Sequence, residues 1–151
     1  MSLDIPDVLE LRVQNDLVSL GTVLDEVEAF LVGLRVAADP CAQVMLIVDE
    51  LASNVVKYAW PTTEVHSFLL RLRATPATDM EPGLRLVIEL EDDGVAFDPA
   101  AAPVPDLEAP LGAREEGGVG WLLVRSMTDE FAHRRADGRN HLRVGTFARL
   151  A

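Results

Sequence analysis

The sequence predicts an α+β fold, a two-layer sandwich in which a mostly antiparallel (mixed) sheet carries about three helices on one face. Two observations lead to this prediction. Several stretches alternate apolar and polar residues, as strands do, and they follow one another without a helix between each pair. Three other stretches space apolar residues three and four apart, as amphipathic helices do. We see no internal repeat, so residues 1–151 are expected to form a single domain.

Length and composition are those of a globular chain. Of its 151 residues, 49% are hydrophobic and 25% are charged, far from the composition of disordered chains. The net charge of −12 argues against direct nucleic-acid binding, which requires a basic surface. No basic leader with an apolar segment and no run of about 18 apolar residues occurs. We therefore expect a soluble, cytoplasmic protein that does not enter a membrane.

The cysteine and the histidines suggest neither a disulfide nor a metal site. Cys41 is the one cysteine, so it cannot form an internal disulfide, and a packing role near a helix start is expected for it. His66, His133 and His141 have no partners at metal-ligand spacing, so surface or packing roles are expected for them.

The first part of the chain predicts one strand and two helices. Residues 8–13 alternate and predict a half-buried strand. From Asp16 onward, one apolar stripe predicts a long helix; its members are Leu17, Leu20, Leu24, Val27, Leu31 and Leu34. A second helix is expected to start with Asp39 as its cap and Pro40 in its first position. It should end just before Pro61.

Two further strands and a long loop follow. Residues 66–73 and 83–92 predict strands, joined by a polar connection that contains prolines. Residues 98–116 have no periodicity and several prolines, so we expect a long loop. Loops of this length in compact domains are usually functional or disordered.

The last part of the chain predicts a helix and a hairpin. Apolar residues at helical spacing predict the third helix; they are Val119, Leu123, Val124, Met127 and Phe131. The remaining residues, from Phe131 onward, alternate on both sides of Asp137 and Gly138. An Asp-Gly pair between alternating stretches predicts a closing hairpin.

The second helix carries an unexpected polar stripe. Gln43, Glu50, Asn54 and Lys57 recur at intervals of seven, four and three, which places them on one face. A solvated back face and a polar cavity explain this spacing equally well.

The strand at residues 83–92 favours the cavity. Asp92 continues the parity of four apolar residues, Leu84, Leu86, Ile88 and Leu90. A carboxylate directed toward the apolar layer requires hydrogen-bond donors from the protein or from a ligand. The alternatives for Asp92 are a strand end that meets solvent or an Asx-type turn into the following residues.

A glycine-rich turn precedes the third helix. The stretch "EEGGVGWLLV" contains Gly117, Gly118 and Gly120. Backbone N–H groups at such a helix start can bind phosphate, although glycines here also simply permit a tight turn.

Taken together, these stretches resemble the nucleotide-binding motifs of the gyrase, heat-shock protein, histidine kinase and MutL (GHKL) ATPase superfamily. Within it they are most similar to the anti-sigma factor serine kinases. "DELASNVVKYA" resembles the asparagine motif, "DDGVAFDP" the Asp-x-Gly motif and "GGVGWLLVRSMTDEF" the glycine motif with its helix. "DGRNHL" resembles the segment that opens the last strand. The resemblance covers nearly the whole chain and implies a Bergerat-type ATP-binding fold.

The resemblance also implies roles for individual residues. Asn54 would bind Mg²⁺ at the phosphates of ATP, Glu50 would be the general base, and Asp92 would accept a hydrogen bond from the adenine amino group. Further nucleotide-binding residues are implied at Lys57, Gly94, Phe97, Arg114, Gly117, Gly118, Val119 and Gly120. Residues 98–118 would form a short lid over ATP, with Arg114 at the γ-phosphate.

By resemblance, the function would be that of an ATP-dependent serine/threonine kinase. It would phosphorylate a small antagonist protein of the STAS (anti-anti-sigma) type and sequester a partner such as a sigma factor, as a homodimer. Ala96 stands where a second glycine is often found, and Trp121 and Leu122 replace smaller residues. These departures motivate an alternative, a nucleotide-gated binding module that transfers no phosphate. A third interpretation is a domain of this fold that binds no nucleotide.

Overall fold

The computed structural model describes residues 7–77, 81–97 and 118–151. Within these ranges the elements are β1 (Asp7–Gln14), α1 (Leu17–Gly33), α2 (Ala38–Tyr58), β2 (Ser67–Ala77), β3 (Gly83–Asp92), α3 (Gly118–Met127), β4 (Glu130–Ala136) and β5 (Arg139–Arg149). Five strands and three helices confirm the predicted α+β class.

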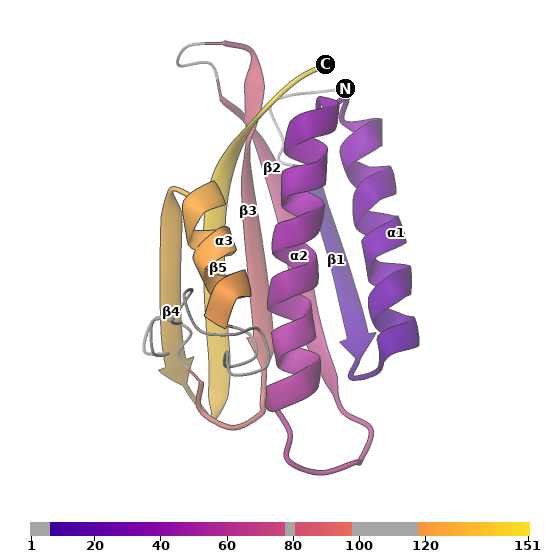
Figure 1. The fold of residues 1–151 in the computed structure, drawn as a ribbon, viewed down its shortest axis with the longest axis vertical. Coiled ribbons are helices and arrows are strands. Elements are labelled where there is room, and N and C mark those ends of the chain that lie inside the picture. Colours follow the sequence, from indigo (N-terminus) through magenta and orange to yellow (C-terminus); the bar gives the residue numbers. More distant parts are fainter. Residues whose placement is uncertain (1–6, 78–80, 98–117) are drawn as a thin grey trace.

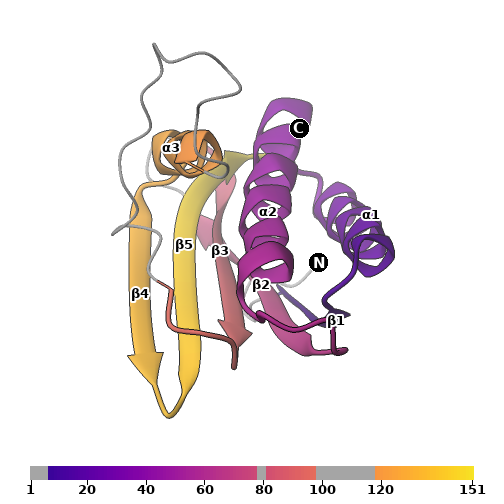
Figure 2. The same cartoon turned by 60° about the horizontal axis from the view of Figure 1, so that its bottom comes forward.

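The five strands form one sheet in the order β1-β2-β3-β5-β4. Every neighbouring pair is antiparallel. The three helices lie on the same face of this sheet in both views (Figures 1 and 2). Helix α2 lies between α1 and α3, contacts both, and also contacts β3 and β5. The residues of α2 are therefore placed at the centre of the helical layer, which agrees with its nearly all-round apolar sequence. None of the helices in the described ranges is long and apolar enough to cross a membrane.

Helix α1 begins where the sequence predicts it. Asp16 caps it by accepting a hydrogen bond from the Ser19 backbone N–H at 2.7 Å, which satisfies one free donor of the first turn. The buried stripe consists of Leu20, Val23, Val27 and Leu31. Leu17 is 74% exposed, so the predicted stripe is wrong at its first member.

Helix α2 begins two residues earlier than predicted. Ala37 holds the cap position, without a side-chain cap bond, and Asp39 lies inside the first turn. The start is fixed from outside the helix, because the Ala37 N–H donates to the Arg149 carbonyl at 3.0 Å. The Asp39 carboxylate still lies where the helix dipole favours a negative charge. Pro40 is consequently the third residue of the helix rather than the first.

Helix α3 ends at Met127, and Phe131 belongs to β4 rather than to this helix. The chain joins the sheet at Asp129, whose N–H donates to the Gly145 carbonyl at 3.0 Å. Phe131 nevertheless packs against α3, since its ring lies edge-on to Trp121 with the centroids 4.8 Å apart. The prediction that Phe131 is part of the third helix is therefore wrong, although its ring does contact that helix.

The closing hairpin has its predicted turn. Asp137 and Gly138 have φ values of 54° and 72°, and both lie in the left-handed region. Two successive residues of this kind match the twist of the flanking strands. The turn sets the register of β4 against β5, in which Arg135 pairs with Asn140. On its other side, Asn140 pairs with Asp92 of β3.

The expected roles of the cysteine and of two histidines agree with the structure. Cys41 is half-buried against the core. His66 stacks on Trp60 with the ring centroids 4.8 Å apart, and His141 lies 3.9 Å from the Glu91 carboxylate. In the part of the chain that the structure describes, no three His, Cys, Asp or Glu side chains form a group that could hold a metal.

Candidate active site

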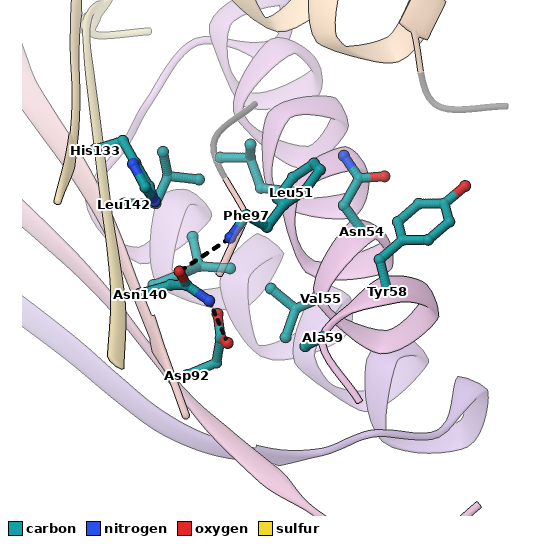
Figure 3. A pocket seen from close by; sticks show the side chains of 11 residues that line it. Leu51, Asn54, Val55, Tyr58, Ala59, Asp92, Phe97, His133, Asn140 and Leu142 are labelled. Atoms are coloured by element: carbon teal, nitrogen blue, oxygen red, sulfur yellow. Dashed lines mark hydrogen bonds between the residues drawn. The ribbon is translucent and has the colours of Figure 1, made fainter. Parts of the chain in front are cut away.

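A cavity opens between the C-terminal half of α2 and strands β3, β4 and β5 (Figure 3). Its free volume is about 30 Å³, room for about two water molecules, so its mouth must widen before a larger ligand can enter. Most of its lining is apolar or aromatic and a few polar groups converge on it. The lining residues are Leu51, Asn54, Val55, Tyr58, Ala59, Leu90, Asp92, Phe97, His133, Asn140 and Leu142.

Asp92 supplies a buried carboxylate to this cavity. It is 6% exposed, and its parity along β3 is the one that the sequence predicts. Its Oδ1 accepts hydrogen bonds from the Gly94 N–H at 2.9 Å and from Asn140 Nδ2 at 3.0 Å. The Asx-type turn considered from the sequence is thus present, but inside the protein rather than in solvent. Both bonds fall on one oxygen, and Oδ2 accepts none from the described residues.

Asn140 is a site residue that our sequence analysis missed. It is 5% exposed and lines the cavity. The parity argument that identified Asp92 also applies to β5, where Asn140 shares its face with Leu142, Val144 and Ala148. A buried amide at the start of an apolar strand face could therefore have been found from the sequence.

The turn after β3 is held tightly against the end of α2. The Val95 N–H donates to the Ala59 carbonyl at 2.7 Å. A Cβ atom on Gly94 would overlap the backbone and Cβ of Ala59, so this close approach requires glycine. Arg135 of β4 secures the turn from the other side, because its Nη1 donates to the Gly94 carbonyl at 2.8 Å.

Glu50 and Asn54 lie one turn apart on α2 and are both half-buried. Asn54 lines the cavity. The carboxylate of Glu50 lies against Gly120, in the first turn of α3, at the position where a Cβ atom would be. The two residues therefore extend the polar region from the cavity toward the start of α3. Lys57, the next member of the predicted stripe, is exposed.

The environment of Glu50 shifts its pKa. Burial raises the pKa of Glu50 above its ordinary value; the charge of Lys57 opposes this rise and the charge of Asp49 adds to it. A raised pKa brings a carboxylate closer to the range in which it can accept a proton near neutral pH. The position and the protonation of Glu50 are both compatible with a general base.

Two aromatic side chains border the mouth of the cavity. Tyr58 and Phe97 are each 38% exposed, and their rings stack with centroids 6.4 Å apart and planes 27° apart. Figure 3 shows the Phe97 ring between Leu51 and Asn54. The Phe97 N–H donates to Asn140 Oδ1 at 3.3 Å, which fixes the backbone of this rim.

Other predicted site residues lie partly or wholly outside the described ranges. Gly118, Val119 and Gly120 form the first turn of α3. Arg114, Gly117 and the rest of the expected lid, apart from Gly118, lie outside the described residues.

The donor set near Asn54 fits Mg²⁺ bound together with phosphates. Asn54 offers a side-chain oxygen ligand from α2 beside the cavity. Mg²⁺ commonly uses one or two protein oxygens, with phosphate oxygens and water completing its shell. A site of this kind does not need a cluster of three protein ligands.

Comparison with known proteins assigns the family. The model of the histidine kinase-like ATPase domain matches residues 13–146, a range that includes every residue lining the cavity. The chain therefore belongs to the histidine kinase-like ATPase domain family. This confirms the resemblance seen in the motifs, and an ATPase domain implies a site for ATP.

Two individual proteins are similar to the chain. It is 31% identical over 97 residues to the serine/threonine-protein kinase BtrW of Bordetella bronchiseptica, a match that covers 64% of this chain and 63% of BtrW. The crystal structure of the RsbU and RsbW domains of Rv1364c from Mycobacterium tuberculosis covers 96% of this chain with a TM-score of 0.61 and 13% identity. The match covers 34% of that solved chain, and at this identity it shows the fold alone. The chain thus spans less than two thirds of either protein.

Proposed function

We propose that this chain is an ATP-dependent protein serine/threonine kinase that regulates a partner protein, of the anti-sigma factor type. The observation that carries the proposal is the shared cavity, which Asp92 and Asn54 line from a strand and a helix. Glu50 extends the same polar region to the first turn of α3. Similarity to a relative named a serine/threonine-protein kinase supports the proposal.

The cavity is the proposed adenine site. Asp92 Oδ2 accepts a hydrogen bond from the amino group of the base, which compensates the burial of this carboxylate. Leu51, Val55 and Leu142 provide apolar walls for the ring. Gly94 keeps the turn after β3 close to α2, so that this wall of the cavity stays in place.

The proposed phosphate site lies between α2 and the start of α3. Gly118, Val119 and Gly120 present backbone N–H groups there, and a helix start favours phosphate. Asn54 would hold Mg²⁺, which when bound spreads the charge of the transferring phosphoryl group. Arg114, Gly117 and Lys57 remain proposed nucleotide-binding residues.

Glu50 has a separate chemical role in the proposal. The hydroxyl oxygen of a Ser or Thr on the partner forms a bond to the γ-phosphorus of ATP, while the bond from that phosphorus to the leaving ADP oxygen breaks. Glu50 accepts the hydroxyl proton as the new bond forms. The raised pKa of Glu50 suits this role, since the base must take up a proton during transfer and release it afterwards.

The proposed substrate is a small STAS-type antagonist protein, and the proposed regulated partner is a sigma factor bound by a homodimer of this single domain. The test is incubation of the purified chain with Mg²⁺, γ-labelled ATP and purified STAS-type proteins of the same organism. We expect label on one Ser or Thr of one of these proteins. Nucleotide binding without any labelled product would contradict the kinase and leave the binding module.

One finding bears on the alternative of a binding module without phosphate transfer. That alternative was motivated partly by the bulky Trp121 after the glycines. In the structure the Trp121 ring packs edge-on against Phe131, and the Arg125 guanidinium lies 5.9 Å from its centre. The size of Trp121 is thus used to pack α3 onto β4, so this residue gives no reason to prefer the binding module.

A further inference from the structure

The side chain of Asn140 joins three parts of the cavity wall. Its Nδ2 donates to Asp92 Oδ1 at 3.0 Å and to the Val95 carbonyl at 2.8 Å. Its Oδ1 accepts from the Phe97 N–H at 3.3 Å. One buried amide therefore links the end of β3, the following turn and the aromatic rim (Figure 3).

This arrangement uses both N–H donors of the Asn140 amide inside the protein. The nearby backbone donors are also used, since the Gly94 N–H bonds to Asp92 and the Val95 N–H bonds to Ala59. The polar end of the cavity therefore offers acceptors to a ligand, chiefly Asp92 Oδ2, and no donor from these groups.

The register of the sheet explains why Asn140 can act directly on Asp92. The two residues are paired across β3 and β5, and both side chains point toward the helical layer. A carboxylate can rotate about its χ2 bond, so Asp92 needs a fixed neighbour to keep one oxygen toward the cavity. Asn140 and Gly94 hold Oδ1 from two sides.

We propose that Asn140 is a positioning residue that orients the Asp92 carboxylate and thereby sets the preference of the cavity for a base with an amino group. This inference rests on the proposed nucleotide-binding function and adds a specificity-determining residue to it. Adenine presents an amino group to Asp92 Oδ2. Guanine presents a carbonyl oxygen at the equivalent position. This oxygen and the carboxylate are both acceptors, so no hydrogen bond can form between them.

The test measures the dissociation constants of Mg-ADP and Mg-GDP by calorimetry, which needs no phosphate transfer. For the wild type we expect ADP to bind at least about 100-fold more tightly than GDP. Asn140→Ala should weaken ADP binding about 10-fold to 100-fold, as expected for losing a hydrogen bond to a charged group. It should weaken GDP binding much less. The preference for adenine should therefore shrink.

Asn140→Asp provides a second variant with a different signature. Two carboxylates at hydrogen-bond distance cannot both ionise easily, so they share one proton at lower pH. ADP affinity of this variant should be low at about pH 8 and recover as the pH falls, whereas the wild type should show no such recovery. A merely structural role of Asn140 does not predict this pH profile.

Thr146→Val is the matched control. Thr146 is also buried on the inner face of β5, and its hydroxyl donates to the Met127 carbonyl at 3.0 Å, away from the cavity. It should lower the melting temperature without changing the ADP-to-GDP ratio. An unchanged ratio in Asn140→Ala, or ADP affinity of Asn140→Asp that does not depend on pH, would overturn the inference alone. A wild type that binds neither nucleotide would overturn the proposed function as well.

Discussion

The carboxylate of Glu50 occupies the position where a Cβ atom of Gly120 would have to lie. Helices α2 and α3 contact each other, and this point joins the proposed base to the proposed phosphate-binding turn. Any side chain at residue 120 must therefore displace the carboxylate or the helix.

Gly120→Ala should separate stability from activity. The added methyl group meets the end of a flexible side chain rather than backbone, and alanine favours a helix over glycine by about 1 kcal/mol. The free energy of unfolding should thus stay within about 1 kcal/mol of the wild type. Phosphate transfer should fall at least about tenfold, because Glu50 loses its position. Thermal unfolding and the initial transfer rate measure the two effects.

Gly21→Ala, on α1, is the control for this prediction. A Cβ atom there has no heavy atom within 4 Å, so the variant should gain about 0.5–1 kcal/mol of stability and keep its activity. If Gly120→Ala transferred phosphate at the wild-type rate, the contact with Glu50 would not be required for transfer.

Glu50→Gln should abolish transfer while nucleotide still binds. Loss of a general base costs about 100-fold or more, whereas the affinity for Mg-ADP should change less than about threefold. Wild-type transfer should increase with pH as Glu50 loses its proton, over a range above the ordinary pKa of glutamate because burial raises the pKa of Glu50. The pH–rate profile measures this directly.

Asp49→Asn tests the electrostatic part of that prediction. The Asp49 charge raises the pKa of Glu50, so its removal should move the rate profile to lower pH without abolishing transfer. If Asp49→Asn lost all transfer while Glu50→Gln stayed active, the general base would be Asp49, and our assignment of Glu50 would be wrong.

Gly94→Ala should damage both the fold and the site. Its Cβ atom would overlap the backbone of Ala59, which cannot move aside as a flexible side chain can. We expect a loss of about 1–3 kcal/mol in the free energy of unfolding and weaker Mg-ADP binding. Denaturant unfolding and calorimetry measure these effects, and unchanged values for both would show that the turn has room that the structure does not show.

An ion-pair group on β3, β4 and β5 predicts a loss of stability in acid. Hydrogen bonds from Arg85 and then Arg143 hold the pKa of Glu130 below its ordinary value, at 2.7 Å and 2.8 Å. A depressed pKa in the folded state contributes stability that is present above the ordinary pKa and is lost as the pH falls through the folded-state value. Arg85→Met should therefore be less stable near neutral pH and lose less on acidification. Urea unfolding between about pH 3 and about pH 7 tests this, and parallel curves for the two proteins would contradict it.

Much of the fold could be predicted because its signals are local. Alternation along β3 identified the face of Asp92. The Asp-Gly pair identified the hairpin turn, and in the structure both of its residues are left-handed. The start of α2 could not be predicted in this way. Its cap position is Ala37, which has no capping side chain, and a hydrogen bond to the distant Arg149 fixes it.

The candidate site was predictable to the same extent. Asn54 and Asp92 follow from helical and strand spacing, and both line the cavity. The contact between Glu50 and Gly120 depends on how α3 packs on α2, which no local pattern encodes. The role of Arg135 could not be predicted either, because its hydrogen bond to the Gly94 carbonyl connects residues 41 apart in sequence.

The most direct test of the proposed site is a crystal structure with Mg²⁺ and a non-hydrolysable ATP analogue. We expect the adenine amino group within hydrogen-bond distance of Asp92 Oδ2, Mg²⁺ at Asn54, and the phosphates at the first turn of α3. Nucleotide bound elsewhere, or a cavity that stays closed by Phe97 at saturating analogue, would contradict the assignment.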